Sequence, residues 1–81
     1  MATYKCEVKQ RYGKYSGWVW KATERQGNPV CADEATSAVA VAKVVDSLRD
    51  GDFGSGDEVI FRDIAYTALS DLRTVMARAP Y

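Results

Sequence analysis

Apolar and polar residues alternate near the start of the chain. In TYKCEVKQRY, residues 3–12, one side of the alternation is charged and the other is apolar. The apolar side consists of Tyr4, Cys6, Val8 and Tyr12. A period of two residues predicts a half-buried strand.

A second segment, WVWKATER at residues 18–25, is rich in aromatic residues and predicts a second strand after a connector at 13–17. Alternation places Trp18, Trp20 and Ala22 on the face that we expect in the core. The opposite face then carries Val19, Lys21, Thr23 and Arg25.

Turn residues at 26–28 and Pro29 precede a short third strand, expected at residues 30–32. Pro29 lacks an N–H group, so it is typical of the start of an edge strand. The three predicted strands are joined most simply as an antiparallel meander.

The apolar period becomes helical between residues 35 and 48. One face of the predicted helix carries Ala38, Val41, Ala42, Val45 and Leu48. Asp33, Thr36 or Ser37 is expected to cap its start, and Gly51 to end it.

A second amphipathic stripe runs from Phe61 to Met76 and predicts a second helix that ends before Pro80. We expect this helix to begin between residues 57 and 63. In one alternative, Ser55 and Glu58 form a capping box. In the other, residues 58–61 form a short strand and Asp63 caps the helix.

Together these elements predict an α+β domain in the order β-β-β-α-(β)-α. A small three-stranded antiparallel sheet, a meander, carries both helices on one face, and its other face is exposed. The 81 residues are 47% hydrophobic, which is typical of one compact domain over 1–81.

Composition narrows the possible chemistry. The chain has no histidine, which removes the commonest general base and metal ligand, so we expect a non-enzymatic protein without a cofactor. Cys6 and Cys31 permit one disulfide at most, and we expect both to be buried thiols. The N-terminal residues lack the apolar core of a signal peptide, and no apolar run could span a membrane, so we expect a cytoplasmic location.

The formal net charge of zero hides an asymmetry between the two halves of the chain. Residues 1–32 contain six basic and two acidic residues, whereas residues 33–81 contain five basic and nine acidic ones. Such an imbalance favours binding of a polar partner.

The segment RDGDFGSGDE at residues 49–58 is the most acidic part of the chain. Counted from Asp50 as an EF-hand loop, it fails at three positions, those of Gly54, Ser55 and Phe61, so no metal site is expected. Its charge would repel a phosphate group. It therefore suits a basic protein partner. We call it, with Asp46, the acidic turn, and its candidate residues are Asp46, Asp50, Asp52, Asp57 and Glu58.

Nucleic acid is the alternative partner. A basic sheet face is predicted from Lys5, Lys9, Arg11, Lys21 and Arg25. With the tryptophans assigned to the core, only Tyr12 and Tyr15 would remain near it to stack on bases.

The run YSGWVWKATERQGNPV followed by ATSAVAVAKVV resembles small type I anti-CRISPR proteins of phages and mobile elements, over residues 16–50. The resemblance implies an inhibitor that acts in the bacterial cytoplasm. Such a protein would bind a crRNA-guided surveillance complex and block recruitment of DNA, and the acidic turn would dock on its basic surface. A phage-like structural or assembly protein, monomeric or dimeric through an edge strand near residues 29–32, is a further alternative.

Overall fold

The computed structural model describes residues 1–81 and has an α+β fold, as the sequence predicts. Five strands and two helices follow one another in the order β-β-β-α-β-β-α. Their bounds are β1 Thr3–Arg11, β2 Lys14–Lys21, β3 Cys31–Glu34, α1 Ser37–Asp50, β4 Glu58–Phe61, β5 Ile64–Tyr66 and α2 Leu69–Arg78. No helix is long and apolar enough to cross a membrane.

The strands form one mixed sheet in the order β3-β2-β1-β4-β5. The first three strands form the predicted antiparallel meander. The prediction of a three-stranded sheet is wrong, because β4 adds to the free edge of β1 in parallel and β5 then pairs with β4. The helix α1 supplies the long crossover that a parallel pair requires.

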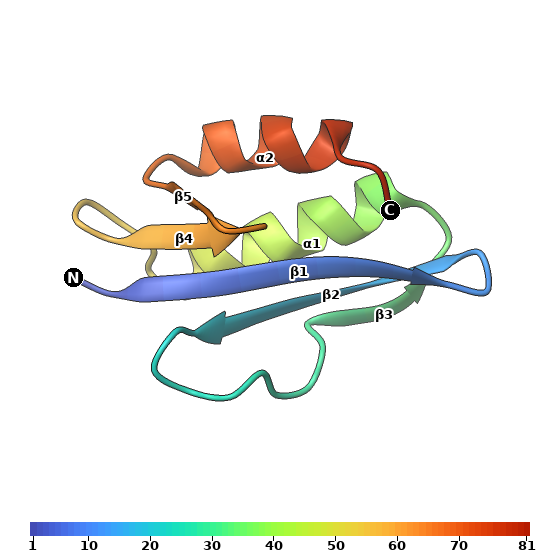
Figure 1. The fold of residues 1–81 in the computed structure, drawn as a ribbon, viewed down its shortest axis with the longest axis horizontal. Helices are drawn as coiled ribbons and strands as arrows, with labels where there is room; N and C mark the ends of the chain where they lie inside the picture. The colour runs from blue at the N-terminus through green and yellow to red at the C-terminus, as the bar shows by residue number, and fades with distance from the viewer.

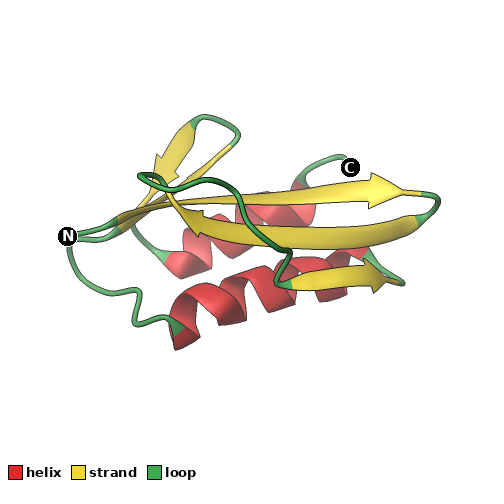
Figure 2. Cartoon of the chain, turned by 90° about the horizontal axis from the view of Figure 1, so that it is seen from below, coloured by secondary structure: helices red, strands yellow, loops and turns green.

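Both helices lie on one face of the sheet, and the two views in Figures 1 and 2 agree on this. Twelve buried apolar side chains fill the space between the layers. Leu48 from α1, Val59 from β4 and Leu72 from α2 are at most 1% exposed, so all three regions meet in a single core. We call the helix-covered side of the sheet the covered face and the other side the open face.

The first hairpin turn decides which residues of β2 face the helices. Instead of a connector at 13–17, the turn consists of Tyr12 and Gly13 alone, both at positive φ. Residues with positive φ at both central positions are typical of a tight type I′ hairpin. As a result β2 begins at Lys14, and Tyr12 is 90% exposed rather than in the core.

The register of this hairpin reverses the predicted faces of the second strand. Val8 lies opposite Gly17 and Cys6 lies opposite Val19, so Gly17 and Val19 belong to the covered face. Trp18 and Trp20 therefore lie on the open face, and their predicted assignment to the core is wrong.

Gly17 has a packing role on the covered face. A Cβ atom at this position would lie 2.5 Å from Val44 Cγ2 and 3.2 Å from Cys31 Sγ. The helix α1 therefore approaches β2 so closely that any side chain at Gly17 would displace it.

The helix α1 confirms the predicted first helix. Thr36 caps it, since its hydroxyl oxygen accepts a hydrogen bond from the Val39 N–H group at 3.2 Å, and Gly51 ends it. The buried face is Ala40, Val41, Val44, Val45 and Leu48. Ala38, which we expected in this face, is exposed.

The second helix begins later than predicted. Residues 58–61 form a strand, as one of the two alternatives stated, but Asp63 is a turn residue and caps nothing. Arg62 and Asp63 have φ of 51° and 68° and form the tight turn between β4 and β5. The helix then begins after Ala68, and it ends before Pro80 as predicted.

Both cysteines are free and buried, which confirms the prediction of buried thiols. Burial raises the pKa of Cys6 to about 12, and it also raises the pKa of Cys31. A protonated, inaccessible thiol is a poor nucleophile, so neither residue is suited to covalent chemistry.

Candidate functional site

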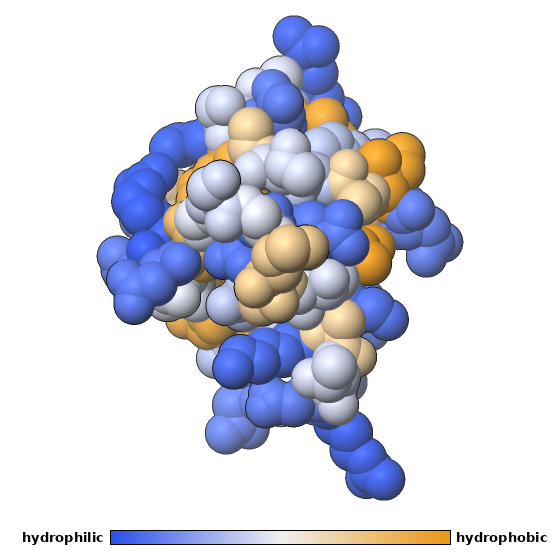
Figure 3. Space-filling model, turned by 90° about the vertical axis from the view of Figure 1, so that its left-hand side faces the viewer, coloured by the Kyte–Doolittle hydropathy of each residue, from blue (hydrophilic) through white to orange (hydrophobic).

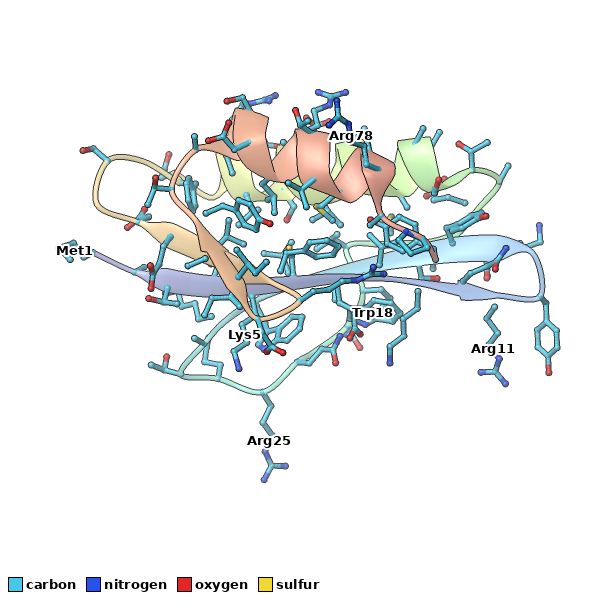
Figure 4. All side chains as sticks on the ribbon, turned by 45° about the horizontal axis from the view of Figure 1, so that its top comes forward. Met1, Lys5, Arg11, Trp18, Arg25 and Arg78 are labelled. Carbon is cyan, nitrogen blue, oxygen red and sulfur yellow. The ribbon has the colours of Figure 1, made fainter.

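The open face carries two tryptophans at its centre. Trp18 lies opposite Glu7 and Trp20 lies opposite Lys5 across the β1–β2 pair. Both indoles are half-buried, and in Figure 4 Trp18 lies with Lys5 on the side of the sheet away from the helices. Directly opposite residues of an antiparallel pair have neighbouring side chains, so each indole lies beside a charged group of β1.

Cationic side chains surround the tryptophans. Lys5, Lys9 and Arg11 alternate along β1 and share the open face, as predicted, and Lys14 begins the neighbouring strand. The Lys9 ammonium lies 6.0 Å from the centre of the Trp18 ring, within reach of a cation–π interaction. The result is a sheet face on which aromatic rings and positive charges alternate.

The other two residues of the predicted basic face lie elsewhere. Lys21 pairs with Tyr4 and is exposed on the covered side, at the end of β2. Arg25 belongs to the loop at residues 22–30, and in Figure 4 it extends away from the sheet on the open side. The shifted register of β2 accounts for the position of Lys21, and Arg25 lies outside the sheet because β2 ends at Lys21.

This loop passes beneath the open face. Figure 2, which looks onto the open face, shows it crossing in front of the strands. The Gln26 amide donates a hydrogen bond of 3.2 Å to the Glu7 carboxylate, and the Val30 N–H group donates one of 2.8 Å to the Gly17 carbonyl. Together with the hydrogen bond of 2.8 Å from the Ala22 N–H group to the Thr3 carbonyl, these contacts attach the loop to the sheet on the side that carries the tryptophans.

The open face is hollowed into two shallow grooves. One, of about 380 Å³, has Lys5, Glu7, Lys9, Trp20, Ile60 and Arg62 among its lining residues. The other, of about 460 Å³, is lined by Lys9, Gln10, Arg11, Lys14, Ser16, Trp18 and Asp33. The volumes fall within the usual range for small-ligand sites, and each groove contains one tryptophan and at least two cations.

The acidic turn connects α1 to β4, and three of its five candidate residues have partners within the molecule. Asp57 accepts hydrogen bonds from the N–H groups of Ala2, at 2.8 Å, and Gly54, at 3.1 Å. Glu58 accepts one from the Thr3 hydroxyl, and Asp46 forms an ion pair with Arg49. These contacts give the acidic residues a structural role.

The two N–H groups on Asp57, that of Gly54 first and that of Ala2 second, lower the pKa of its carboxyl group. Asp50 and Asp52 are exposed and have no side-chain partner.

Nowhere in the chain do three or more acidic or cysteine side chains come together as metal ligands. Figure 3 looks onto the end of the molecule that carries this turn, where hydrophilic side chains surround a few apolar ones.

A third, apolar groove of about 340 Å³ lies between β5 and α2. Ile64 and Val75 line it and are 58% and 37% exposed. The sequence does not reveal this groove, because Ile64 and Val75 both fit the spacing of one amphipathic helical stripe.

The sequence does contain a signal for the tryptophans on the open face. Two sets of residues alternate along this strand, Tyr15, Gly17 and Val19 on one face and Trp18 and Trp20 on the other. A tight turn at Tyr12-Gly13 places the first set on the core side. Glycine in the middle of a strand also indicates close approach of another backbone.

Comparison of the chain with protein-family models, with curated proteins and with solved structures finds no match. The arrangement of the open face is therefore the strongest basis for assigning a function.

Proposed function

We propose that this protein binds single-stranded nucleic acid on the open face of its sheet, without catalysing a reaction on it. The observation that carries the proposal is the position of Trp18 and Trp20 outside the core, among Lys5, Lys9 and Arg11. Unpaired bases stack on aromatic side chains while the phosphates contact nearby cations.

The geometry favours a single strand over a duplex. The tryptophans are two residues apart on one strand, so their Cα atoms lie about 6–7 Å apart, which suits successive unstacked bases. A duplex would hide its bases from these rings. No helix lies on the open face, so no element is placed to enter a major groove.

The test is titration of a fluorescently labelled dodecathymidylate, in DNA and RNA form, into the wild-type protein at several salt concentrations. Stacking is worth about 1–3 kcal/mol per base, so Trp18→Ala and Trp20→Ala should each weaken binding by roughly 5- to 150-fold. Affinity should also fall as salt rises, because cations on the protein displace counterions from the strand.

A matched control is Tyr66→Ala, which removes an aromatic ring from the covered side of the sheet. Far-ultraviolet circular dichroism establishes that each variant is folded. Absence of binding by the wild type at low salt would overturn the proposal, as would tryptophan variants that bind like the wild type.

The acidic turn supports a second candidate function, that of an anti-CRISPR-like inhibitor. The supporting observation is that Asp50 and Asp52 are exposed and lack a partner within the chain. Their carboxylates would dock on the basic surface with which a crRNA-guided surveillance complex holds DNA, and so block DNA recruitment.

One double variant separates the two functions. Asp50→Lys with Asp52→Lys should abolish inhibition of DNA loading by a purified type I complex if the acidic turn is the binding surface. The same variant should bind oligothymidylate as well as or better than the wild type if the open face is the binding surface, since it adds positive charge. Asp71→Lys, which reverses one exposed charge on α2, shows the effect of added positive charge away from the acidic turn.

A further inference from the structure

Glu7 is the single acidic residue in the two central strands β1 and β2. It lies on the open face, directly opposite Trp18 and diagonal to Trp20. A negative charge here weakens the attraction of any polyanion to this face. Its position in the middle of a surface that otherwise suits phosphates calls for a different role.

The Glu7 carboxylate is held in place but remains accessible. It accepts a hydrogen bond from the Gln26 amide at 3.2 Å, and the Lys9 ammonium lies 3.4 Å from the same oxygen, Oε1. The side chain is still 36% exposed, and its second oxygen, Oε2, has no hydrogen-bond or ion-pair partner within the chain. A carboxylate has about four acceptor positions, so this group can accept further hydrogen bonds.

The groove of about 380 Å³ brings this acceptor together with Trp20, Lys5 and Lys9. Side chains on the diagonal of an antiparallel pair lie roughly 7–8 Å apart. A base that stacks on the Trp20 indole therefore extends its edge toward Glu7, while Lys5 and Lys9 lie near enough to contact the adjoining phosphates.

We propose that Glu7 recognises guanine, by accepting hydrogen bonds from the Watson–Crick edge of a base stacked on Trp20. This inference rests on the proposed function, because it requires a single strand on the open face. Guanine presents two adjacent donors on that edge, N1–H and the N2 amino group, which match the two oxygens of a carboxylate.

The other bases fit this acceptor less well. Adenine and cytosine each place a ring-nitrogen acceptor beside their amino group, and thymine flanks its single N–H donor with two carbonyl oxygens. A carboxylate opposite those acceptors would repel them and leave a polar group unpaired. Glu7 therefore converts a surface that is tolerant of sequence into one with a preference for guanine.

The experiment compares three labelled strands: dodecathymidylate, the same strand with one central deoxyguanosine, and the same strand with deoxyinosine at that position. Deoxyinosine lacks only the N2 amino group. The wild type should bind the guanine strand about tenfold more tightly than dodecathymidylate, since a bidentate contact discriminates by about 1–3 kcal/mol. The inosine strand should fall in between.

The decisive variant is Glu7→Gln, whose amide offers one acceptor and one donor in place of two acceptors. It should lose the preference for guanine, whereas its affinity for dodecathymidylate should rise because a negative charge is removed. Glu24→Gln, which removes the same charge from the exposed loop, should keep the preference. Binding of dodecathymidylate by Glu7→Gln also shows that this variant is folded.

The outcomes separate the inference from the proposed function. Equal affinity of the wild type for the three strands, with tryptophan-dependent binding, would overturn guanine recognition and leave the proposed function in place. A guanine preference that persists in Glu7→Gln would also overturn it. A wild type that binds none of the strands would overturn both.

Discussion

The two faces of the sheet differ in a way that runs against the usual distribution of residue size. The covered face presents Val8, Gly17 and Val19 to the helices together with smaller aromatic rings such as Tyr4 and Phe61, whereas the open face carries both tryptophans. Because α1 packs directly against Gly17, the covered face has no space for an indole there. Large aromatic residues on the side without a helix then call for an explanation in terms of binding rather than folding.

The largest expected effect is on the pH dependence of stability, and it comes from Cys6 on the covered face. Burial raises the pKa of this covered-face thiol from 9.0 to about 12. A group whose folded pKa is raised stabilises the protein fully below its unfolded pKa, and this stabilisation is lost as the pH rises through the folded pKa. The free energy of unfolding should therefore fall between pH 9 and 12, by up to about 4 kcal/mol from this group alone.

The measurement is urea denaturation across that pH range for the wild type and for Cys6→Val, which keeps an apolar side chain and removes the ionisable group. The wild type should lose stability more steeply than the variant. Parallel pH profiles would contradict the prediction and mean that the Cys6 thiolate is tolerated in the folded state.

Truncation of a large side chain should also distinguish the faces. Leu48 of α1 is 1% exposed, so Leu48→Ala should cost about 2–5 kcal/mol of stability through lost burial and the cavity that remains. Trp18→Ala removes more atoms but from a half-buried position, and should cost only about 1 kcal/mol. Denaturant midpoints measure both losses of stability. An equally large loss for Trp18→Ala would mean that Trp18 behaves as a core residue.

Two glycines provide a third comparison, with a smaller effect. Gly17→Ala places a Cβ atom against Val44 and should destabilise the protein by about 1–3 kcal/mol through overpacking. Gly27 lies in the loop below the open face, and a Cβ atom there meets nothing within 4 Å, so Gly27→Ala should change stability by less than about 0.5 kcal/mol.

Thermal unfolding should resolve this pair, because about 1 kcal/mol corresponds to about 4–8 °C in a domain of this size. Equal melting temperatures for the two variants would mean that α1 moves away from Gly17 without cost.

The contrast between the faces also shows what the sequence could predict. The first strand and the first helix are local features that were predictable from the period, whereas capping chemistry narrowed the cap only to Asp33, Thr36 or Ser37, of which the structure uses Thr36. The length of the preceding turn decides which side chains of β2 face the helices. A shift of one residue moves every side chain to the other face, so expecting a connector at 13–17 misplaced both tryptophans.

The C-terminal elements were harder to predict for a similar reason. Phe61, Ile64 and Ala65 fit the spacing of an amphipathic helix, yet they belong to a hairpin with a two-residue turn. The positive φ of Arg62 is uncommon for such a side chain, so no local signal marks the turn. Parallel pairing of β4 with β1 is a long-range contact that periodicity does not reveal.

The candidate site residues also divide into those that a local pattern predicts and those that depend on long-range pairing. Lys5, Lys9 and Arg11 were predictable because they alternate within one strand whose inner face is clearly apolar. The tryptophans were not, because their face depends on the hairpin register. The contact between Gln26 and Glu7 joins a loop to a strand 19 residues earlier, so only the folded chain brings it together.

The smallest expected effect on stability comes from a single charge on each side of the sheet. Lys9 forms an exposed ion pair with Glu7 on the open face, and Lys43 forms one with Glu34 on the helix side, where the hydrogen bond and charge of Glu34 raise the pKa of the ammonium. Lys9→Gln and Lys43→Gln remove the same charge from an exposed ion pair, and each should leave the denaturant midpoint close to that of the wild type.

Binding should separate these two variants although stability does not. If Lys9 neutralises a phosphate on a single strand, Lys9→Gln should make the plot of log affinity against log salt shallower by about 0.7. Lys43→Gln should keep the wild-type slope, since Lys43 lies on the side of the sheet away from the tryptophans. Equal slopes for both variants would mean that only the overall charge of the protein attracts the strand. This result would argue against the open face as the binding surface.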